Sequence, residues 1–351
     1  PRRSRSPPAA APATSPDGRD MVGACLTFCP AAEIDERVRF KELDAHEKPP
    51  GWETMDDGAV AEAARSWACK KYKRSDAGSV QNVPAIVRPP AVLLKCFEHL
   101  RTHVVETGGR DAKQQAMSRY LFLWDRFRAI RKDFILQNFT TGGRVAREVV
   151  VVFEGMARYF VGIERELSGH KEWREGIAHG KHNAESLSET LSALVAFYDM
   201  ARSRGARDVL ANEAEFTQYW LIYFLDQERG AEAGRFLARI ALESPALDAS
   251  DEIRRAAAVR KARDENNWAA FFRVARNSPY LARCLMVAQY ADGVRDGALL
   301  VMGRAQSRGE AYPAADLAEA LGLDDAAAAR VRAVAAGYSI DGDGDVRFVK
   351  D

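Results

Sequence analysis

The feature that most constrains this chain is helical periodicity, which continues with short breaks from residue 31 to residue 335. In one segment, a buried helix face at i, i+4, i+7, i+8 and i+11 is formed by Leu187, Leu191, Leu194, Val195 and Tyr198. Helical segments joined by short polar loops, without alternating strand patterns before residue 335, predict an all-α solenoid of stacked hairpins. No strict internal repeat recurs, so the regular tetratricopeptide arrays are not supported.

The C-terminal part of the chain has a different pattern. Residues 312–325 are predicted to form a short helix with Pro313 in its first turn and an end at Gly322, and Gly337 is predicted to stop a second helix. Alternating residues around "DGDGD" (341–345) then predict a β-hairpin. Helix, helix and hairpin is the winged-helix order, with the wing at 338–350. "DGDGD" also resembles the start of an EF-hand loop, but Val346 replaces the turn glycine.

The charge and cysteine content limit the possible functions. Lys plus Arg (51) nearly balance Asp plus Glu (50), so nucleic-acid binding would need a local basic patch. The five cysteines are sparse and odd in number, which favours reduced thiols in an intracellular protein. No apolar run approaches the roughly 20 residues of a membrane span, so we expect no membrane partner.

We expect four parts along the chain. Residues 1–20 are rich in Pro, Ser and Ala without apolar periodicity, which predicts a disordered tail. Residues 21–90 are an extended and helical N-terminal segment that packs on the repeats, and residues 91–298 are the helical-repeat region. Residues 299–351 are the winged-helix domain.

Two further motifs suggest metal or phosphate chemistry, and neither is complete. Cys25 and Cys29 could supply half of a zinc site, but no second Cys/His pair follows at a suitable distance. "GIAHGKH" (176–182) differs from a phosphate loop because its glycines are one residue too close and His182 replaces the Ser/Thr. There is no G-x-S-x-G elbow. We therefore expect no metal, no cofactor and no enzymatic activity.

The most charged helical segment is "YLFLWDRFRAIRKDFILQN" (120–138). A continuous apolar stripe is formed by Leu123, Phe127, Ile130 and Phe134. Arginines border this stripe, and a buried arginine needs a carboxylate or carbonyl partner. We expect a structural ion-pair lattice, with an anion site as the alternative. Its expected members are Asp125, Arg126, Arg128, Arg131 and Asp133, with Glu154 and Arg158 from the next helix.

A second set of basic residues lies in and just before the predicted winged helix. Winged helices often place such residues along a phosphate backbone. The candidate nucleic-acid-binding residues are Arg304, Arg308, Arg330, Arg332, Arg347 and Lys350. Several aspartates in the same segment leave it only mildly basic, so protein–protein docking is the competing use.

Seven sequence blocks together resemble the Sac/GANP-type family, also called the leucine permease transcriptional regulator family. They are "GACLTFCP", "KKYKRSDAG", "VPAIVRPPAVLL", "YLFLWDRFRAIRKDFILQ", "FEGMARYFV", "ANEAEFTQYWLIYFL" and "NNWAAFFRVARNSPYLARCLM", in the family's order over residues 21–350. The most specific block matches the family at Asp125, Arg126, Arg128, Ile130, Arg131, Asp133 and Gln137. Ala24 and Phe28 depart from the usual Thr and Met.

The resemblance implies a helical-repeat region and a winged helix arranged as in PCI-type domains. It also implies pairing with a second PCI-domain protein through adjacent winged helices, and a small acidic Sem/DSS-type protein that braces this partner. In the family, the joined winged helices offer a basic surface to RNA or DNA. The resemblance places that surface here at Arg332, Arg347 and Lys350.

The leading functional hypothesis is a non-enzymatic scaffold subunit of a nuclear mRNA processing or export complex, similar to the transcription-export complex two. The nucleus, including its envelope and pores, is then the expected location. The alternative is a short family member that acts in centrosome duplication and spindle assembly, in the cytoplasm or at the centrosome.

Overall fold

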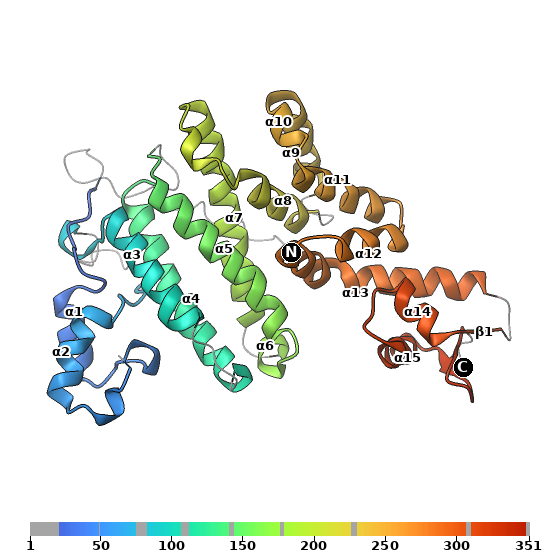
Figure 1. Cartoon of the computed structure of the whole chain (residues 1–351), viewed down its shortest axis with the longest axis horizontal. Helices are drawn as coiled ribbons and strands as arrows, with labels where there is room; N and C mark the ends of the chain where they lie inside the picture. The colour runs from blue at the N-terminus through green and yellow to red at the C-terminus, as the bar shows by residue number, and fades with distance from the viewer. Residues whose placement is uncertain are drawn as a thin grey trace, which may run out of the picture. The chain divides into compact units, whose positions relative to one another are not determined.

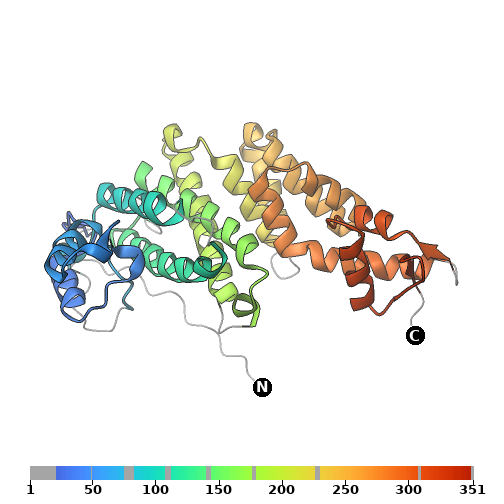
Figure 2. The same cartoon turned by 60° about the horizontal axis from the view of Figure 1, so that its bottom comes forward.

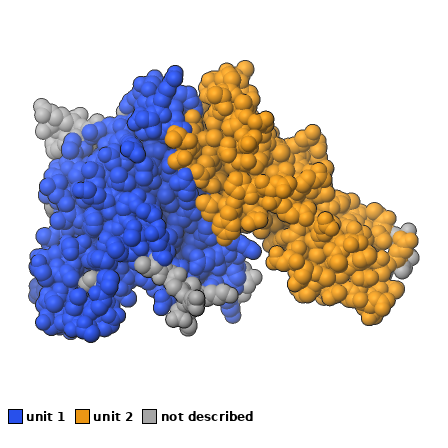
Figure 3. All heavy atoms as spheres, in the orientation of Figure 1, with its two compact units in different colours: residues 1–210 blue, residues 211–351 orange. Residues whose placement is uncertain are grey.

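The structure, a computed structural model, describes residues 21–48, 50–74, 83–106, 112–139, 144–175, 179–225, 230–306 and 310–348. The predicted disordered tail at 1–20 lies outside these residues, as do Arg308 and Lys350. The chain divides into two compact units, residues 1–210 and 211–351 (Figure 3).

The first unit begins with a stretch of short helices and extended segments. Residues 21–26 form neither helix nor strand, and their backbone bonds to the loop before the third helix through Ala24 N to Pro84 O (2.8 Å) and Cys25 N to Val87 O (3.0 Å). The helical elements of this stretch are α1 (Ala31–Arg39), the 3₁₀ turns Ala45–Glu47, Trp52–Thr54 and Pro84–Ile86, and α2 (Asp57–Trp67). This stretch attaches to the longer helices by buried polar contacts.

The longer helices of the first unit form its main core. They are α3 (Pro90–Leu100), which continues as a π-helical turn (Arg101–Val105), α4 (Ala112–Leu136), α5 (Arg147–Leu167), α6 (Lys171–Glu175) and α7 (His179–Ser203), followed by the 3₁₀ turn Arg207–Val209. Helix α5 packs against α3, α4 and α7 (Figure 1). The predicted apolar stripe of α4 is confirmed, because Leu123, Phe127, Ile130 and Phe134 are at most 1% exposed.

The second unit is helical up to its last forty residues. Its helices are α8 (Glu213–Tyr223), α9 (Gly230–Glu243), α10 (Pro245–Asp248), α11 (Asp251–Asp264), α12 (Trp268–Arg276) and α13 (Tyr280–Ala305). Helix α11 packs on α8 and α12, and α13 also packs on α8 and on α12. The predicted boundary between residues 298 and 299 falls inside α13, which is continuous across it.

The end of the second unit has the predicted helix–helix–hairpin order. Its elements are β1 (Ala311–Tyr312), α14 (Ala314–Ala320), α15 (Ala326–Ala335), β2 (Ser339–Ile340) and β3 (Val346–Arg347). They share a core with Ala298 and Leu299 of α13 (Figure 2). The expected glycine stops are present, since Gly322 and Gly337 follow the two helices with φ of 58° and 85°.

The sheet differs from the predicted hairpin by one strand. β1 pairs antiparallel with β3, and the strand order is β1-β3-β2. The sequence was expected to hold no strand before residue 335, and this is wrong at Ala311–Tyr312. A two-residue strand is too short to show an alternating pattern.

The fold class is confirmed in its coarse form: the protein is mostly helical, with a small three-stranded sheet among the described residues. In that same part of the chain, no helix has the length and apolarity needed to cross a membrane.

Candidate functional site

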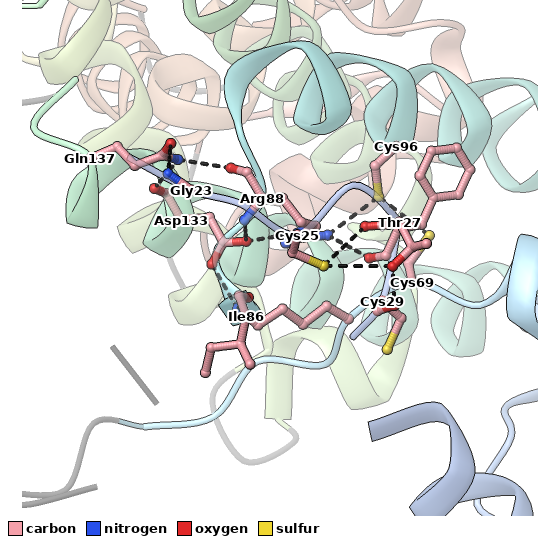
Figure 4. Close-up of polar contacts among 12 residues, drawn as sticks. Gly23, Cys25, Thr27, Cys29, Cys69, Ile86, Arg88, Cys96, Asp133 and Gln137 are labelled. Atoms are coloured by element: carbon pink, nitrogen blue, oxygen red, sulfur yellow. Dashed lines mark hydrogen bonds and ion pairs between the residues drawn. The ribbon is translucent and has the colours of Figure 1, made fainter. Parts of the chain in front are cut away.

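The first candidate region is a buried ion network centred on Asp133 of α4 (Figure 4). Its carboxylate accepts hydrogen bonds from Arg88 Nε at 2.7 Å, from the Arg88 backbone N–H at 3.3 Å and from Lys70 Nζ at 2.9 Å. Burial alone would lower the pKa of Arg88, but the nearby Asp133 and Cys96 outweigh it and the pKa is raised. Arg88 is therefore a permanent cation, fully buried against its partner.

Gln137, one helical turn after Asp133, connects the network to the first residues of the structure. Its Oε1 accepts from Gly23 N at 2.9 Å, and its Nε2 donates to the carbonyls of Arg88 and Asp133 at 2.8 Å each. A Cβ on Gly23 would lie 2.5 Å from the Val87 carbonyl oxygen, so only glycine allows this close approach. Figure 4 shows Gly23, Arg88 and Asp133 beside Gln137.

Glu47 forms a second buried centre, 1% exposed, that joins three segments. It pairs with Arg37 of α1 and with Arg126 of α4, the latter at 3.0 Å, and accepts from the Cys69 N–H at 3.1 Å. Burial, with the neighbouring Arg126, lowers the pKa of Arg37. The two cations of α1 and α4 thus share one carboxylate.

Two thiols lie next to these centres. Cys69 Sγ and Cys96 Sγ are 3.4 Å apart, and Arg88 Nη1 donates to Cys96 Sγ at 3.4 Å. Cys25, Cys29, Cys69, Cys96 and Cys284 are all unpaired and buried. Within the described part of the chain, no group of three or more His, Cys, Asp or Glu side chains is placed to hold a metal ion.

The residues expected to form one lattice lie in several separate surroundings. Asp125 and Arg126 contact each other and Arg126 reaches Glu47, while Asp133 lies with Arg88. Arg131 pairs with Glu189 of α7 at 2.5 Å, and the Arg128 guanidinium lies 3.8 Å from the ring centre of Tyr72.

On α5, Glu154 accepts from Tyr198 at 2.7 Å and lies 3.9 Å from Arg158. Four partners in the two buried ionic centres were not predicted from the sequence: Arg37, Glu47, Lys70 and Arg88. Lys70 lies in the block "KKYKRSDAG" and Arg88 in the block "VPAIVRPPAVLL". Their place in these family-like blocks was the sequence signal that could have pointed to them.

The second candidate region is the C-terminal basic set. Arg332 is held on α13, donating to Asp292 Oδ1 at 3.1 Å and to Asp296 Oδ1 at 2.6 Å. Arg330 Nε donates to the Gly344 carbonyl in the hairpin turn at 2.7 Å. Arg347 is about half exposed, with Asp341 at 3.5 Å, and Arg304 is exposed near the end of α13.

These contacts fix the orientation of α15. Arg330 and Arg332 connect it to the hairpin and to α13, while Ala329 and Ala333 are fully buried. The face left outward is apolar, with Val331 71% and Val334 55% exposed. Ala327 and Ala335 are also exposed and extend this stripe. We call Ala327, Val331, Val334 and Ala335 the α15 stripe. Exposed apolar stripes of this kind are typical of protein-docking faces.

Comparison with known protein families agrees with the family resemblance seen in the sequence, and the match covers residues of both units. The model of the SAC3/GANP family matches residues 28–341. The chain belongs to the SAC3/GANP family. The match includes the ion network and the α15 stripe of this family member.

Individual relatives are SAC3 family protein B of Arabidopsis thaliana, 28% identical over 87% of the chain, and SAC3 family protein 1 of Schizosaccharomyces pombe, also 28% over 87%. Protein xmas of Drosophila melanogaster is 26% identical over 76%. The chain spans 17%, 29% and 12% of the lengths of these three relatives.

Proposed function

We propose that this SAC3/GANP chain is a non-enzymatic scaffold of a nuclear mRNA processing or export complex, whose C-terminal elements pair with a PCI-domain protein. In this proposal the helices are a PCI-type helical repeat, and residues 311–348 form a winged helix. A small acidic Sem/DSS-type protein braces the partner. Family membership supports the export role, and the α15 stripe is the single observation that carries the pairing.

The two arginines of α15 are bound within the chain, whereas its outward valines are exposed. Its arginines are bound within the chain, to Gly344 and to Asp292 and Asp296. A phosphate at Arg332 would have to compete with two carboxylates, whereas the outward valines lose water contact only if another surface covers them. Covering an exposed apolar stripe is favourable, so a protein partner fits this face better than a nucleic acid.

Nucleic-acid contact is then assigned to basic residues outside the α15 stripe. Arg304 and Arg347 are exposed, and we propose that they contact RNA or DNA together with Arg308 and Lys350. Arg330 holds α15 against the hairpin turn and Arg332 holds it against α13, so both arginines act mainly by positioning this helix. Phosphate contacts of this type weaken steeply with salt.

The pairing is tested by affinity capture from nuclear extract followed by mass spectrometry. The wild-type chain should recover a PCI-domain protein with a small acidic subunit, and the double variant Val331→Glu/Val334→Glu should lose both. Leu242→Glu is the matched control, because Leu242 is 84% exposed on α9 of the same unit. Recovery of centrosomal proteins without a PCI-domain protein would favour the centrosome and spindle role instead.

Nucleic-acid contact is tested separately by fluorescence anisotropy with a labelled single-stranded RNA, in the presence of the captured partner. Arg304→Glu/Arg347→Glu should weaken binding at about 50 mM salt and flatten its salt dependence. Arg254→Glu, an exposed residue of α11, is the control. Undetectable binding by the wild-type complex at this salt concentration would exclude the RNA contact but leave the pairing intact.

A further inference from the structure

A small hollow in the first unit is distinct from the C-terminal docking face. Its volume is about 210 Å³, below the roughly 300–1,000 Å³ of pockets that hold drug-sized ligands. Its apolar lining comes from Pro30, Ala32, Ile86 and Ala129. These residues belong to the start of α1, to the loop before α3 and to α4, so three segments build the hollow.

Apart from Tyr72, the remaining lining of the hollow is charged, and most of its carboxylates already have partners within the chain. Asp133 is fully buried against Arg88 and Lys70, and Glu33 is buried and accepts from the Lys71 N–H at 2.8 Å. Glu36 is 57% exposed and lies 3.8 Å from Lys73. Lys70 is bound to Asp133, so the outward charges are the ammonium groups of Lys71, Lys73 and Lys132 and the single carboxylate of Glu36.

We call the outward lysines of the hollow, Lys71, Lys73 and Lys132, its rim, and all three are at least partly exposed to solvent. Lys73 is 48% exposed, and Lys71 and Lys132 are partly exposed. For Lys71 Nζ, no carboxylate of the described residues lies within 4.0 Å. The rim therefore presents positive charge around an apolar centre.

The wall of the hollow is formed before any ligand arrives. The Tyr72 N–H donates to Asp125 Oδ2 at 3.2 Å, and Arg128 lies over the Tyr72 ring at 3.8 Å. Lys132 Nζ donates to the Lys73 carbonyl at 2.7 Å, which holds the 70–73 segment along α4. A fixed wall reduces the ordering entropy lost on binding.

We propose that this hollow binds a short acidic segment of another protein by inserting one apolar side chain between the lysines. An apolar side chain fits the floor of Pro30, Ala32 and Ile86, and flanking Asp or Glu residues fit the ammonium rim. Single-stranded nucleic acid fits less well, because bases need an open aromatic face and Arg128 covers one face of Tyr72.

Residues 1–20 of the same chain match this hollow poorly in charge. They contain four arginines and two aspartates, a net charge of +2, which lysines around the hollow would repel. We therefore assign the acidic segment to a partner protein. This site lies in residues 30–133, so its test does not depend on the pairing proposed for α15.

The experiment uses fluorescence anisotropy with a labelled 12-residue peptide that carries a central Phe between runs of Asp and Glu. Two matched peptides replace the Phe by Ser or the acidic residues by Gln. The acidic Phe peptide should bind the full chain, and each matched peptide should bind at least about tenfold more weakly, because one buried aromatic side chain and a set of rim charges each contribute this much.

Two variants test the location of the site. Ala32→Trp fills the hollow from an exposed position on α1, and Lys71→Glu/Lys73→Glu reverses the rim charge. Both should weaken the peptide about tenfold or more, while Lys261→Glu, 76% exposed on α11, should not. Circular dichroism checks that both variants are folded. If Ala32→Trp is not folded, the location of the site is judged from Lys71→Glu/Lys73→Glu alone.

The proposal is overturned if the wild-type chain binds the Phe and Ser peptides equally, or if neither variant changes the affinity. It is also overturned if single-stranded RNA binds through Lys71 and Lys73 while the acidic peptide does not. That last result would make the segment a nucleic-acid surface.

Discussion

Arg88 and Asp133 form an ion pair, 2.7 Å from Nε to Oδ2, in which neither side chain is exposed to solvent. The two residues are 45 positions apart, one in the loop before α3 and the other in α4. Lys70 and Gln137 bind to the same pair and extend it to the segment that follows α2 and to the residues around Gly23. The ion pair therefore joins the N-terminal segment to the long helices of the first unit.

Breaking this pair should destabilise the first unit strongly. Arg88→Met leaves Asp133 buried with Lys70 as its remaining cation, and we expect the free energy of unfolding to fall by about 3–5 kcal/mol. Urea denaturation followed by circular dichroism measures the change. Arg254→Met, which removes an exposed pair on α11, should cost no more than about 1 kcal/mol. Equal effects of the two substitutions would contradict the assigned role of Arg88.

The sequence was sufficient to predict local structure. The spacing of Leu123, Phe127, Ile130 and Phe134 identified the buried face of α4, and the glycines at 322 and 337 identified the ends of α14 and α15. Both signals act within one helix, where periodicity and backbone conformation follow from neighbouring residues.

The ionic partners could not be predicted in the same way, because they come from segments far apart in the chain. Glu47 lies 79 residues from Arg126, in a 3₁₀ turn. The expected lattice named Asp133 as a member but did not include Arg88, with which Asp133 forms its buried ion pair. On α15, charge indicated a basic surface, whereas the described contacts bind Arg332 to two aspartates.

Arg126 and Arg131 lie on the same helix and should differ in their contribution to stability. Arg126 is 3% exposed and shares Glu47 with Arg37, so Arg126→Ala should lower the free energy of unfolding by about 3–5 kcal/mol. Arg131 pairs with Glu189, which is 61% exposed, so Arg131→Ala should cost less than about 1 kcal/mol. Thermal unfolding of the two variants measures the difference, with Arg158→Ala as a third case in which the arginine is 37% exposed. A larger loss of stability for Arg131→Ala than for Arg126→Ala would show that the Arg131–Glu189 pair contributes more than the buried Arg126–Glu47 pair.

Gly23 should tolerate no side chain. In Gly23→Ala the new Cβ would lie 2.5 Å from the Val87 carbonyl oxygen and would push apart the two extended segments. We expect a loss of about 1–3 kcal/mol and faster hydrogen exchange at Ala24 and Cys25, whose N–H groups bond across this contact. Gly297→Ala is the control, since its Cβ would meet nothing within 4 Å on α13 and should stabilise the helix by about 0.5–1 kcal/mol. Unchanged exchange at Ala24 in Gly23→Ala would show that the segment adapts to the extra methyl group.

His99 should make the stability of the first unit depend on pH. Burial, with a smaller effect of His103, lowers the pKa of His99 from 6.5 to about 4. Its ring packs on Trp67 at 4.7 Å and on Phe28 at 5.2 Å, surroundings that favour the neutral imidazole. Between pH 6.5 and about 4 the unfolded chain binds a proton that the folded chain does not, so stability should fall as the pH is lowered through this window.

The measurement is the difference in unfolding free energy between the wild type and His99→Phe at pH 7.5, 5.5 and 4.5. Carboxylates titrate equally in both proteins, so the difference isolates His99, and the variant should lose less stability on acidification. Burial also lowers the pKa of His46, so part of the dependence should remain in the variant. His170→Phe, a substitution outside this aromatic cluster, should keep the wild-type slope. If NMR titration of the wild type gives His99 a pKa near 6.5, the ring is solvated and the assigned packing against Trp67 is wrong.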